Sequence, residues 1–318
     1  MIDFDAGERR LNKFLGSEKK DTVLLAGAVY MIKYPDPIRE QKRKEVISYK
    51  NNQYSEHIGS RIFMSCGIDA QETALGYFTD RTTGKRKIVV GCKDFTQNGG
   101  TLYEMDKLSN PIAPDEGQLG TTIETVNRII DETELITDKK SIKDGFWDMF
   151  VVDTLIGNKD RHFGNWGILE KNGEVSFAPV YDCGSALSAL LEDGEMEELI
   201  EAPGAFKAEE YNIASVYHMS GRRIRYHEIF KKPPKDLTNA ILRTVPKINM
   251  DEVYAIVDSI AHISDKRKEY LKQALGMRYE QILAPALRRA LNEQNRAADI
   301  ETDYWQTGEE GDKEDIER

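Results

Sequence analysis

The sequence lacks two kinds of hydrophobic segment. No apolar run approaches the roughly 18 residues that a membrane-spanning helix needs, so we expect no membrane span. The N-terminus, Met1-Ile2-Asp3-Phe4-Asp5, has no basic start followed by an apolar stretch, which a secretory signal peptide requires. We therefore expect a cytoplasmic location.

Cysteine is also scarce, with three in 318 residues. Cys66, Cys92 and Cys183 lie far apart, are odd in number and match no metal-ligand spacing. Such a set is typical of reduced thiols in a cytosolic protein and not of a disulfide framework.

The chain has no excess of basic residues, because its net charge is −11. A nucleic-acid-binding protein neutralises phosphates with lysine and arginine, so we expect no direct contact with nucleic acid. Residues 299–318 hold nine acidic and two basic residues, a net charge of −7. This tail is expected to be a solvated, disordered extension, with partner binding as the alternative.

The first part of the chain has patterns typical of a small sheet with one helix. Strands are predicted at 22–26, 29–34, 70–79 and 86–95, and a helix at 51–66. Gly27 allows a tight turn between the first two strands, and Gly67 ends the helix.

Gln97-Asn98-Gly99-Gly100 is the best candidate for a linker, and the pattern beyond it is mainly helical. Helices are predicted at 121–131, 142–156, 250–262 and 265–295. The helix at 142–156 is too apolar for a surface position and should be buried on most sides. Strands at 166–169 and 175–178 form a predicted hairpin around an Asn172-Gly173 turn.

These patterns predict an α+β fold with three parts. Residues 1–96 form a small strand-rich unit, residues 97–295 a larger helical unit with an embedded hairpin, and residues 296–318 an acidic tail. Ligands often bind in the cleft between two such units.

The loop Gly157–Gly167, between the buried helix and the hairpin, is dense in Asp, Arg, His and Asn. Packing alone explains it poorly, because each buried polar group would need its own hydrogen-bond partner. Phosphoryl transfer explains it better, since that reaction needs a carboxylate near the attacking hydroxyl and oxygen ligands for magnesium. Asp160 and Asn165 have the five-residue separation of the kinase loop H-R-D-L-x-x-x-N.

A second acidic turn follows the hairpin, at Asp182-Cys183-Gly184. Asp182 stands where kinases place the aspartate of their D-F-G motif. The intervening hairpin should bring Asn165 and Asp182 side by side, so that both can hold one metal cluster. The alternative is that Asp160, Asn165 and Asp182 merely cap or form turns, but their joint spacing favours a site.

These motifs resemble those of the HipA-like serine/threonine kinases, especially the short forms of that family. Tyr30-Met31-Ile32-Lys33-Tyr34-Pro35 is similar to the family's strand with the ATP-binding lysine, and Glu56 sits where its ion-pair partner is expected. Phe146–Leu155 leads into the polar loop as in the short forms. The resemblance covers residues 15–285 and implies a two-lobed, protein-kinase-like fold that also resembles phosphoinositide kinases, with a nucleotide-binding N-lobe and a helical C-lobe.

The resemblance also implies ATP and Mg2+ as cofactors, a protein substrate and autophosphorylation. Asp160 would accept or orient the proton of the substrate hydroxyl, while Asn165 and Asp182 would bind magnesium. His162 is a further catalytic candidate; it could act on the γ-phosphate, orient the loop, or be a satisfied polar core group. A separate antitoxin protein, or export as an effector without a signal peptide, fits the family as well.

For the nucleotide, the resemblance implies that Lys33 contacts the α- and β-phosphates and that Glu56 steadies it. Lys93-Asp94 would lie at the hinge, where backbone groups bind adenine. The phosphate-covering loop would be the segment with Gly16 and Ser17, although no G-x-G-x-x-G motif is present there. Further departures are the order D-R-H in place of H-R-D and the lack of an A-P-E segment after Asp182.

Two other functions stay open at this point. The D-R-H-x-x-N and Asp-x-Gly motifs also occur in phosphoinositide-type lipid kinases, but residues 185–201 are acidic and would repel anionic lipid. A non-catalytic nucleotide-binding module is the second alternative. The intact set of Lys33, Asp160, Asn165 and Asp182 speaks against it.

Overall fold

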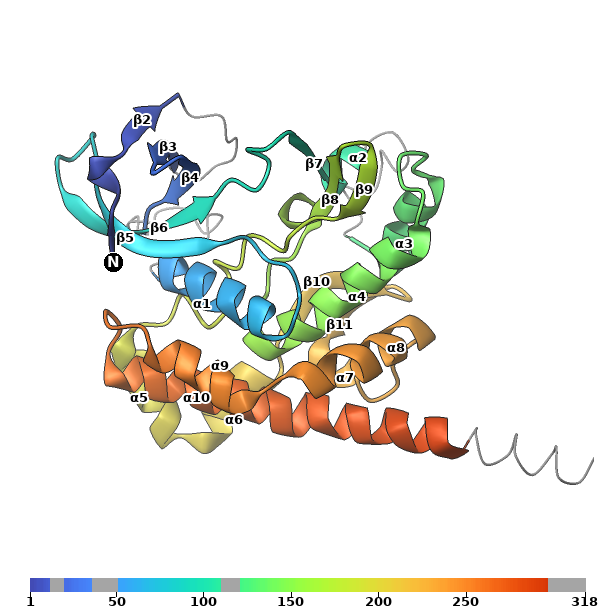
Figure 1. The fold of residues 1–318 in the computed structure, drawn as a ribbon. Helices are drawn as coiled ribbons and strands as arrows, with labels where there is room; N and C mark the ends of the chain where they lie inside the picture. Colours follow the sequence, from blue (N-terminus) through green and yellow to red (C-terminus); the bar gives the residue numbers. More distant parts are fainter. Residues whose placement is uncertain (12–19, 36–50, 110–120, 297–318) are drawn as a thin grey trace, which may run out of the picture.

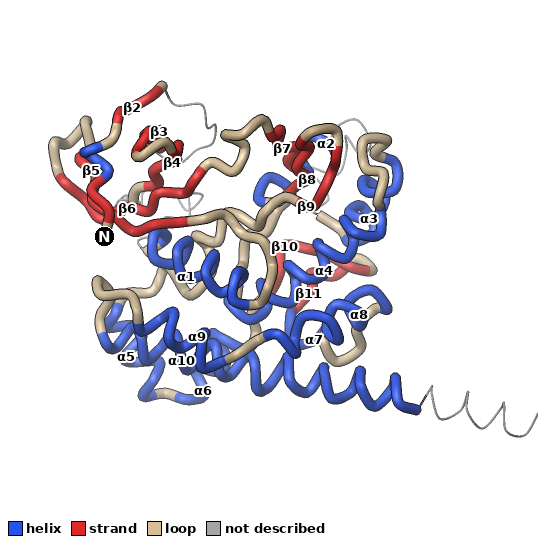
Figure 2. The backbone as a smooth tube through the Cα atoms, in the orientation of Figure 1, coloured by secondary structure: helices blue, strands red, loops and turns tan. Residues whose placement is uncertain are grey.

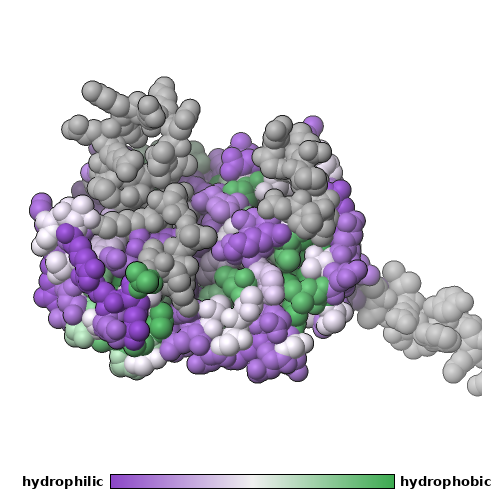
Figure 3. Space-filling model, turned by 90° about the horizontal axis from the view of Figure 1, so that it is seen from above, coloured by the Kyte–Doolittle hydropathy of each residue, from purple (hydrophilic) through white to green (hydrophobic). Residues whose placement is uncertain are grey.

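The computed structural model describes residues 1–11, 20–35, 51–109 and 121–296 of the chain. Strands gather in two places at the top of the view in Figure 1, and the lower part is mainly helical, with one further pair of strands among the helices (Figures 1 and 2). None of the helices in the described ranges has the length and apolar character that a bilayer span needs. Seen from above, the described surface is mostly hydrophilic, with scattered hydrophobic groups (Figure 3).

A six-stranded sheet forms the N-terminal part. Its strands are β1 (Ile2–Asp3), β2 (Glu8–Arg10), β3 (Lys20–Leu25), β4 (Ala28–Lys33), β5 (Thr73–Thr79) and β6 (Arg86–Lys93), in the order β1-β5-β6-β4-β3-β2. Helix α1 (Asn52–Ser65) packs on β5 and β6. The four predicted strands and the predicted helix are confirmed, whereas β1 and β2 were not predicted.

Phe4 explains why the first ten residues belong to this sheet. Its side chain is fully buried, and its ring fills the space left by two glycines on neighbouring strands, Gly76 of β5 and Gly91 of β6. A Cβ atom at Gly91 would lie only 2.3 Å from Phe4 Cζ. Because Gly76 and Gly91 have no side chains, the Phe4 ring can pack against both strands and anchor the N-terminal segment.

Gly91→Ala is expected to destabilise the protein by about 1–3 kcal/mol, because the added methyl group overpacks the contact with Phe4. Urea denaturation followed by tryptophan fluorescence and circular dichroism measures this loss. Gly194→Ala is the matched control, since an added methyl group there meets no atom within 4 Å. Equal midpoints for the parent and Gly91→Ala would show that Phe4 does not anchor the segment.

Helix α4 (Lys139–Ile156) is the centre of the C-terminal part (Figure 1). Most residues of its second half are buried, which confirms the prediction of a central buried helix. Phe146 lies at the middle of an aromatic cluster, with ring centroids 5.0 Å from Trp166 and 5.3 Å from Tyr217. This cluster holds α4 against the elements that follow the polar loop.

A separate three-stranded sheet packs beside α4 in the C-terminal part. It consists of β7 (Gly100–Glu104), β8 (Gly167–Lys171) and β9 (Glu174–Phe177). The predicted hairpin is confirmed, with Asn172 and Gly173 both at positive φ in its turn. Strand β7 was not predicted; it begins at the end of the glycine-rich segment and pairs with β8. The division of the chain after residue 96 stays a prediction.

The other elements of the described C-terminal part are mainly helical. They are α2 (Met105–Ser109), α3 (Ile123–Glu132), α5 (Asp193–Glu201), α6 (Pro203–Tyr211), α7 (Tyr226–Ile229), α8 (Lys235–Thr244), α9 (Met250–Asp258) and α10 (Asp265–Arg278). A π-helical turn, Tyr279–Leu283, continues α10, and helix extends to residue 296, as predicted for this region. The hairpin of β10 (Ala214–Met219) and β11 (Arg222–Arg225) was not predicted.

Candidate active site

Three charged residues from distant parts of the chain meet between the six-stranded sheet and α4. Lys33 ends β4, Glu56 lies on α1, and Asp182 follows β9. Lys33 Nζ is 3.3 Å from Glu56 Oε2 and 3.0 Å from Asp182 Oδ1. The backbone N–H of Asp182 also donates to Glu56 Oε1 over 3.2 Å. The structure thus brings together the residues that were expected to share a nucleotide site.

The cations around Asp182 favour its ionised form. Burial raises the pKa of the Asp182 carboxyl, but the charge and the hydrogen bond of Lys33, together with the charges of Lys20 and Arg161, outweigh burial and hold the pKa below its usual value. For Glu56, burial dominates over Lys33 and raises the pKa. Asp182 is therefore an anion at neutral pH, as a ligand for a hard cation must be.

The loop that carries Asp160 begins at a left-handed turn. Gly157 has a φ of 67° and ends α4, and its N–H donates to Asp153 O, as does the N–H of Asn158. The side-chain oxygen of Asn158 accepts the backbone N–H of Asp160 over 3.0 Å. These bonds fix the backbone at Asp160 immediately after the helix.

Arg161 braces this loop from inside. Its guanidinium donates to both carboxylate oxygens of Asp153, over 2.8 and 3.0 Å, and its side chain is 1% exposed. It also donates to Asn165 O over 2.8 Å and to Tyr181 O. Because Tyr181 precedes Asp182, one buried side chain ties the polar loop to the acidic turn. No local pattern in the sequence indicates that Arg161 pairs with Asp153.

Asp160, His162 and Asn165 lie within this braced loop. Asn165 Nδ2 donates to Asp160 O over 2.7 Å, which leaves Asn165 Oδ1 to act as a ligand. His162 Nδ1 accepts the N–H of Gly164, so Nε2 carries the proton of the neutral ring; it lies 4.0 Å from Asp160 Oδ2. The Asp160 carboxyl is partly exposed, and burial, reinforced by the charge of Asp182, raises its pKa.

The two remaining groups of predicted nucleotide-binding residues differ in their placement. Lys93 ends β6 and Asp94 follows it, but the backbone N–H of Lys93 donates to Glu72 O and that of Asp94 to Val29 O. A base could therefore not use these two N–H groups without displacing the carbonyls. Gly16 and Ser17 lie outside the described residues.

The strands beside Gly16 and Ser17 are described. Arg10 of β2 faces Thr22 of β3 in an antiparallel ladder, and β3 in turn pairs with β4, which carries Lys33. The chain between Arg10 and Lys20 thus links two adjacent strands, of which β3 pairs with the lysine strand.

The oxygen ligands in this site suit magnesium. Asp182 offers a carboxylate and Asn165 an amide oxygen, and no cluster of three or more His, Cys, Asp or Glu residues that could hold a metal occurs in the described ranges. Magnesium keeps several waters and is often bound through one or two protein oxygens plus substrate phosphates. The residues present therefore fit a metal that arrives with a nucleotide.

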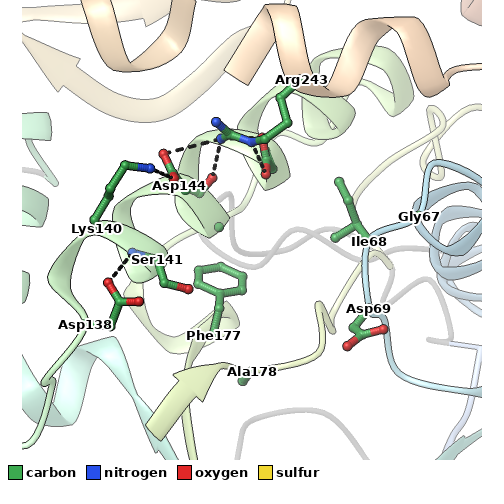
Figure 4. Close-up of a pocket in the computed structure, with 12 residues that line it drawn as sticks. Gly67, Ile68, Asp69, Asp138, Lys140, Ser141, Asp144, Phe177, Ala178 and Arg243 are labelled. Atoms are coloured by element: carbon green, nitrogen blue, oxygen red, sulfur yellow. Dashed lines mark hydrogen bonds and ion pairs between the residues drawn. The ribbon is translucent and has the colours of Figure 1, made fainter. Parts of the chain in front are cut away.

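A polar hollow of about 410 Å³ lies elsewhere, between α4, α8 and the segment before β5 (Figure 4). None of the predicted site residues lines it. Arg243 forms an ion pair with Asp148 over 2.8 Å. Asp144 lies between Arg243 and Lys140 (Figure 4). Its charges are largely matched by one another, so it does not supply the reactive groups.

Comparison with known proteins gives consistent matches over most of the chain. The model of the HipA-like C-terminal domain family matches residues 16–248. The serine/threonine-protein kinase CtkA of Helicobacter pylori is 34% identical over 298 residues, which are 91% of this chain and 89% of that protein.

Solved structures were compared as well. The crystal structure of the Helicobacter pylori proinflammatory kinase CtkA superposes with a TM-score of 0.82 at 33% identity, over 92% of this chain and 98% of that chain. A complex of HipA, HipB and operator DNA from Shewanella oneidensis gives a TM-score of 0.46 at 12% identity, over 82% of this chain and 60% of that chain. The second likeness is too low to support an argument.

Proposed function

Because this chain belongs to the HipA-like serine/threonine kinase family, we propose that Asp160, Asn165 and Asp182 form the centre at which it transfers the γ-phosphate of ATP to a protein hydroxyl. The predicted family and the predicted two-lobed, kinase-like α+β fold are confirmed. The chain is a serine/threonine protein kinase, and not a lipid kinase or a non-catalytic module.

The contact of Lys33 with both Glu56 and Asp182 is the observation that supports these roles most strongly. A buried lysine that touches two carboxylates is held in place before any nucleotide arrives. Lys33 can then bind the α- and β-phosphates while Glu56 keeps its orientation. Mg2+, when bound with the nucleotide, would neutralise charge on the transferred phosphate.

The reaction itself needs few groups from the protein. The substrate hydroxyl oxygen forms a bond to the γ-phosphorus, the bond from that phosphorus to the β–γ bridging oxygen breaks, and ADP leaves with the electron pair. Asp160 orients the hydroxyl and takes its proton. His162, whose Nε2 faces Asp160, helps to position that carboxylate.

Incubation with γ-labelled ATP and Mg2+ tests the proposal. We expect label on serine or threonine of the protein itself or of casein, and loss of labelling when EDTA removes the metal. Phosphoinositide vesicles in the same assay should stay unlabelled. Label in lipid alone, or none in either substrate, would contradict the proposed function.

The partners follow from the class of enzyme. The substrate is a protein with an accessible hydroxyl, and autophosphorylation is part of the proposal because the family resemblance implies it. A separate antitoxin protein, and a role as an exported effector, stay predictions of the same kind.

A further inference from the structure

The end of α4 is bound by two segments that lie far from it in the sequence. The last carbonyl groups of a helix have no partner within the helix and need one outside it. Leu155 O accepts a hydrogen bond from Arg278 Nε over 2.7 Å, and Ile156 O accepts one from the backbone N–H of Leu187 over 2.9 Å. The C-terminal helix and the loop after Asp182 therefore both hold the point where the catalytic loop begins.

Glu210 connects these two segments with each other. It lies on α6 and is 0% exposed. Its carboxylate accepts hydrogen bonds from Ser188 Oγ and Tyr270 Oη, each over 2.5 Å, and forms an ion pair with Arg278. Burial raises the pKa of Glu210, but Arg278 and the two hydroxyl groups outweigh it and hold the pKa below its usual value. Glu210 and Arg278 thus form a buried pair of charges. Such a pair is stable only while both charged groups and their hydrogen-bond partners remain in place.

Together these contacts close a ring. It runs from the end of α4 through Arg278 to Glu210, from Glu210 to Ser188, and from the adjacent Leu187 back to α4. Leu187 and Ser188 have φ angles of 56° and 49°, which side-chain-bearing residues adopt at a cost of order 1–3 kcal/mol each. Two such residues in sequence indicate that the ring imposes this conformation.

Arg278 also shapes the first turn of the catalytic loop directly. A Cβ atom at Gly157 would lie 3.0 Å from Arg278 Nη1 and 3.1 Å from its Cζ, so the guanidinium lies against this glycine. Asp160 follows three residues later. The π-helical turn of the C-terminal helix starts directly after Arg278, and such irregular turns often occur at functional positions.

We propose that the Glu210–Arg278 pair is a positioning device for phosphoryl transfer, which fixes the catalytic loop with Asp160 relative to the segment after Asp182. This inference rests on the proposed function. Neither Glu210 nor Arg278 touches the nucleotide-binding residues in any contact above. Their loss should therefore misplace Asp160 and lower kcat, while Lys33 and Asp182 continue to bind ATP.

Arg278→Lys tests this, because lysine keeps the positive charge but cannot reach Glu210 and Leu155 O at once. We expect kcat to fall about 10- to 100-fold, as for a misplacement of about 1 Å, with KM for ATP within about threefold of the parent. Arg267→Lys is the matched control. Arg267 lies on the same helix, is 4% exposed, and donates to Leu191 O and Asp193, but forms no part of the ring. Its replacement should cost comparable thermal stability and leave kcat within about twofold.

A second readout does not depend on activity. Amide hydrogen exchange in the segment 157–165 should become faster in Arg278→Lys and stay unchanged in Arg267→Lys. Ser188→Ala, which removes one hydroxyl from the ring, should also lower kcat without changing KM for ATP, but by less than Arg278→Lys does. Equal losses of kcat in Arg278→Lys and Arg267→Lys, or parental exchange in Arg278→Lys, would overturn the inference. If the parent transferred no phosphate, the proposed function would fail. The exchange measurement would still show whether the ring holds the segment 157–165 in place.

Discussion

Asp160→Asn is expected to lower kcat by about 10³-fold or more, equal to about 4 kcal/mol of transition-state stabilisation. Asparagine keeps the size of the side chain but cannot take the proton of the attacking hydroxyl. Because Asp160 makes no contact with Lys33 or Glu56 in the structure, the affinity for ATP should stay within a few-fold of the parent. Single-turnover transfer from labelled ATP and fluorescent-nucleotide binding measure the two quantities separately.

The same variant should be more stable than the parent at neutral pH. Burial raises the pKa of Asp160 in the folded protein, so folding favours its protonated form. Its contribution to stability is then fully present below the ordinary pKa of an aspartate and is lost as the pH rises through the raised value. The gain in Tm on Asp160→Asn should therefore be present near about pH 7.5 and vanish below about pH 3.

That pattern also serves as the control for the loss of activity. An inactive variant with a raised Tm is folded, so its defect lies in the reaction. Buried charges that serve function commonly reduce stability. A parental kcat in Asp160→Asn would show that Asp160 takes no part in the reaction. A lowered Tm at neutral pH would show that the Asp160 carboxylate does not destabilise the folded protein.

Asp182→Asn is expected to abolish the gain in ATP affinity that Mg2+ provides. In the proposed role, Asp182 supplies an anionic oxygen to the metal, so the parent should bind ATP more tightly with Mg2+ than without it. Without the metal, the variant should bind ATP as well as the parent or better, because the carboxylate that repels the triphosphate is gone. Phosphate transfer should fall by about 10³-fold, as for a residue of the reactive centre.

Titration calorimetry with ATP, in Mg2+ and in EDTA, separates these effects. Asp69→Asn is the matched control. Asp69 is exposed and lies close to the acidic turn, because its neighbour Ala70 forms a β-bridge with Val180, and Val180 is two residues before Asp182. It should bind the metal–nucleotide complex as the parent does. An equal response to Mg2+ in the parent and in Asp182→Asn would show that Asp182 is not a metal ligand.

The parts of the fold that could be predicted are those with a strong local pattern. The apolar stretch in α4 required burial, and Asn172-Gly173 fixed the hairpin of β8 and β9. Strands β1 and β7 lacked such a signal. Strand β1 has two residues and pairs with β5, about seventy positions away, so no local pattern could indicate it.

The same limit applies to the site. Spacing alone linked Asp160 with Asn165, and the hairpin between Asn165 and Asp182 indicated that Asp182 lies nearby. The supporting charges could not be found in this way. Glu209 and Glu210 are neighbours in one helix; Glu209 pairs with Lys159 at the surface, while Glu210 is fully buried beside Arg278. Only the packing of distant helices distinguishes the two glutamates.

The left-handed backbone of Asp182, with a φ of 58°, restricts how this position can vary. Aspartate, asparagine and glycine tolerate that conformation, whereas β-branched residues are strained in it. An alanine or valine here would combine a backbone penalty with the missing carboxylate, and a resulting defect would have two causes. Few substitutions at this position therefore remove the carboxylate and leave the turn intact; asparagine and glycine do so, and of these asparagine also keeps the size of the side chain.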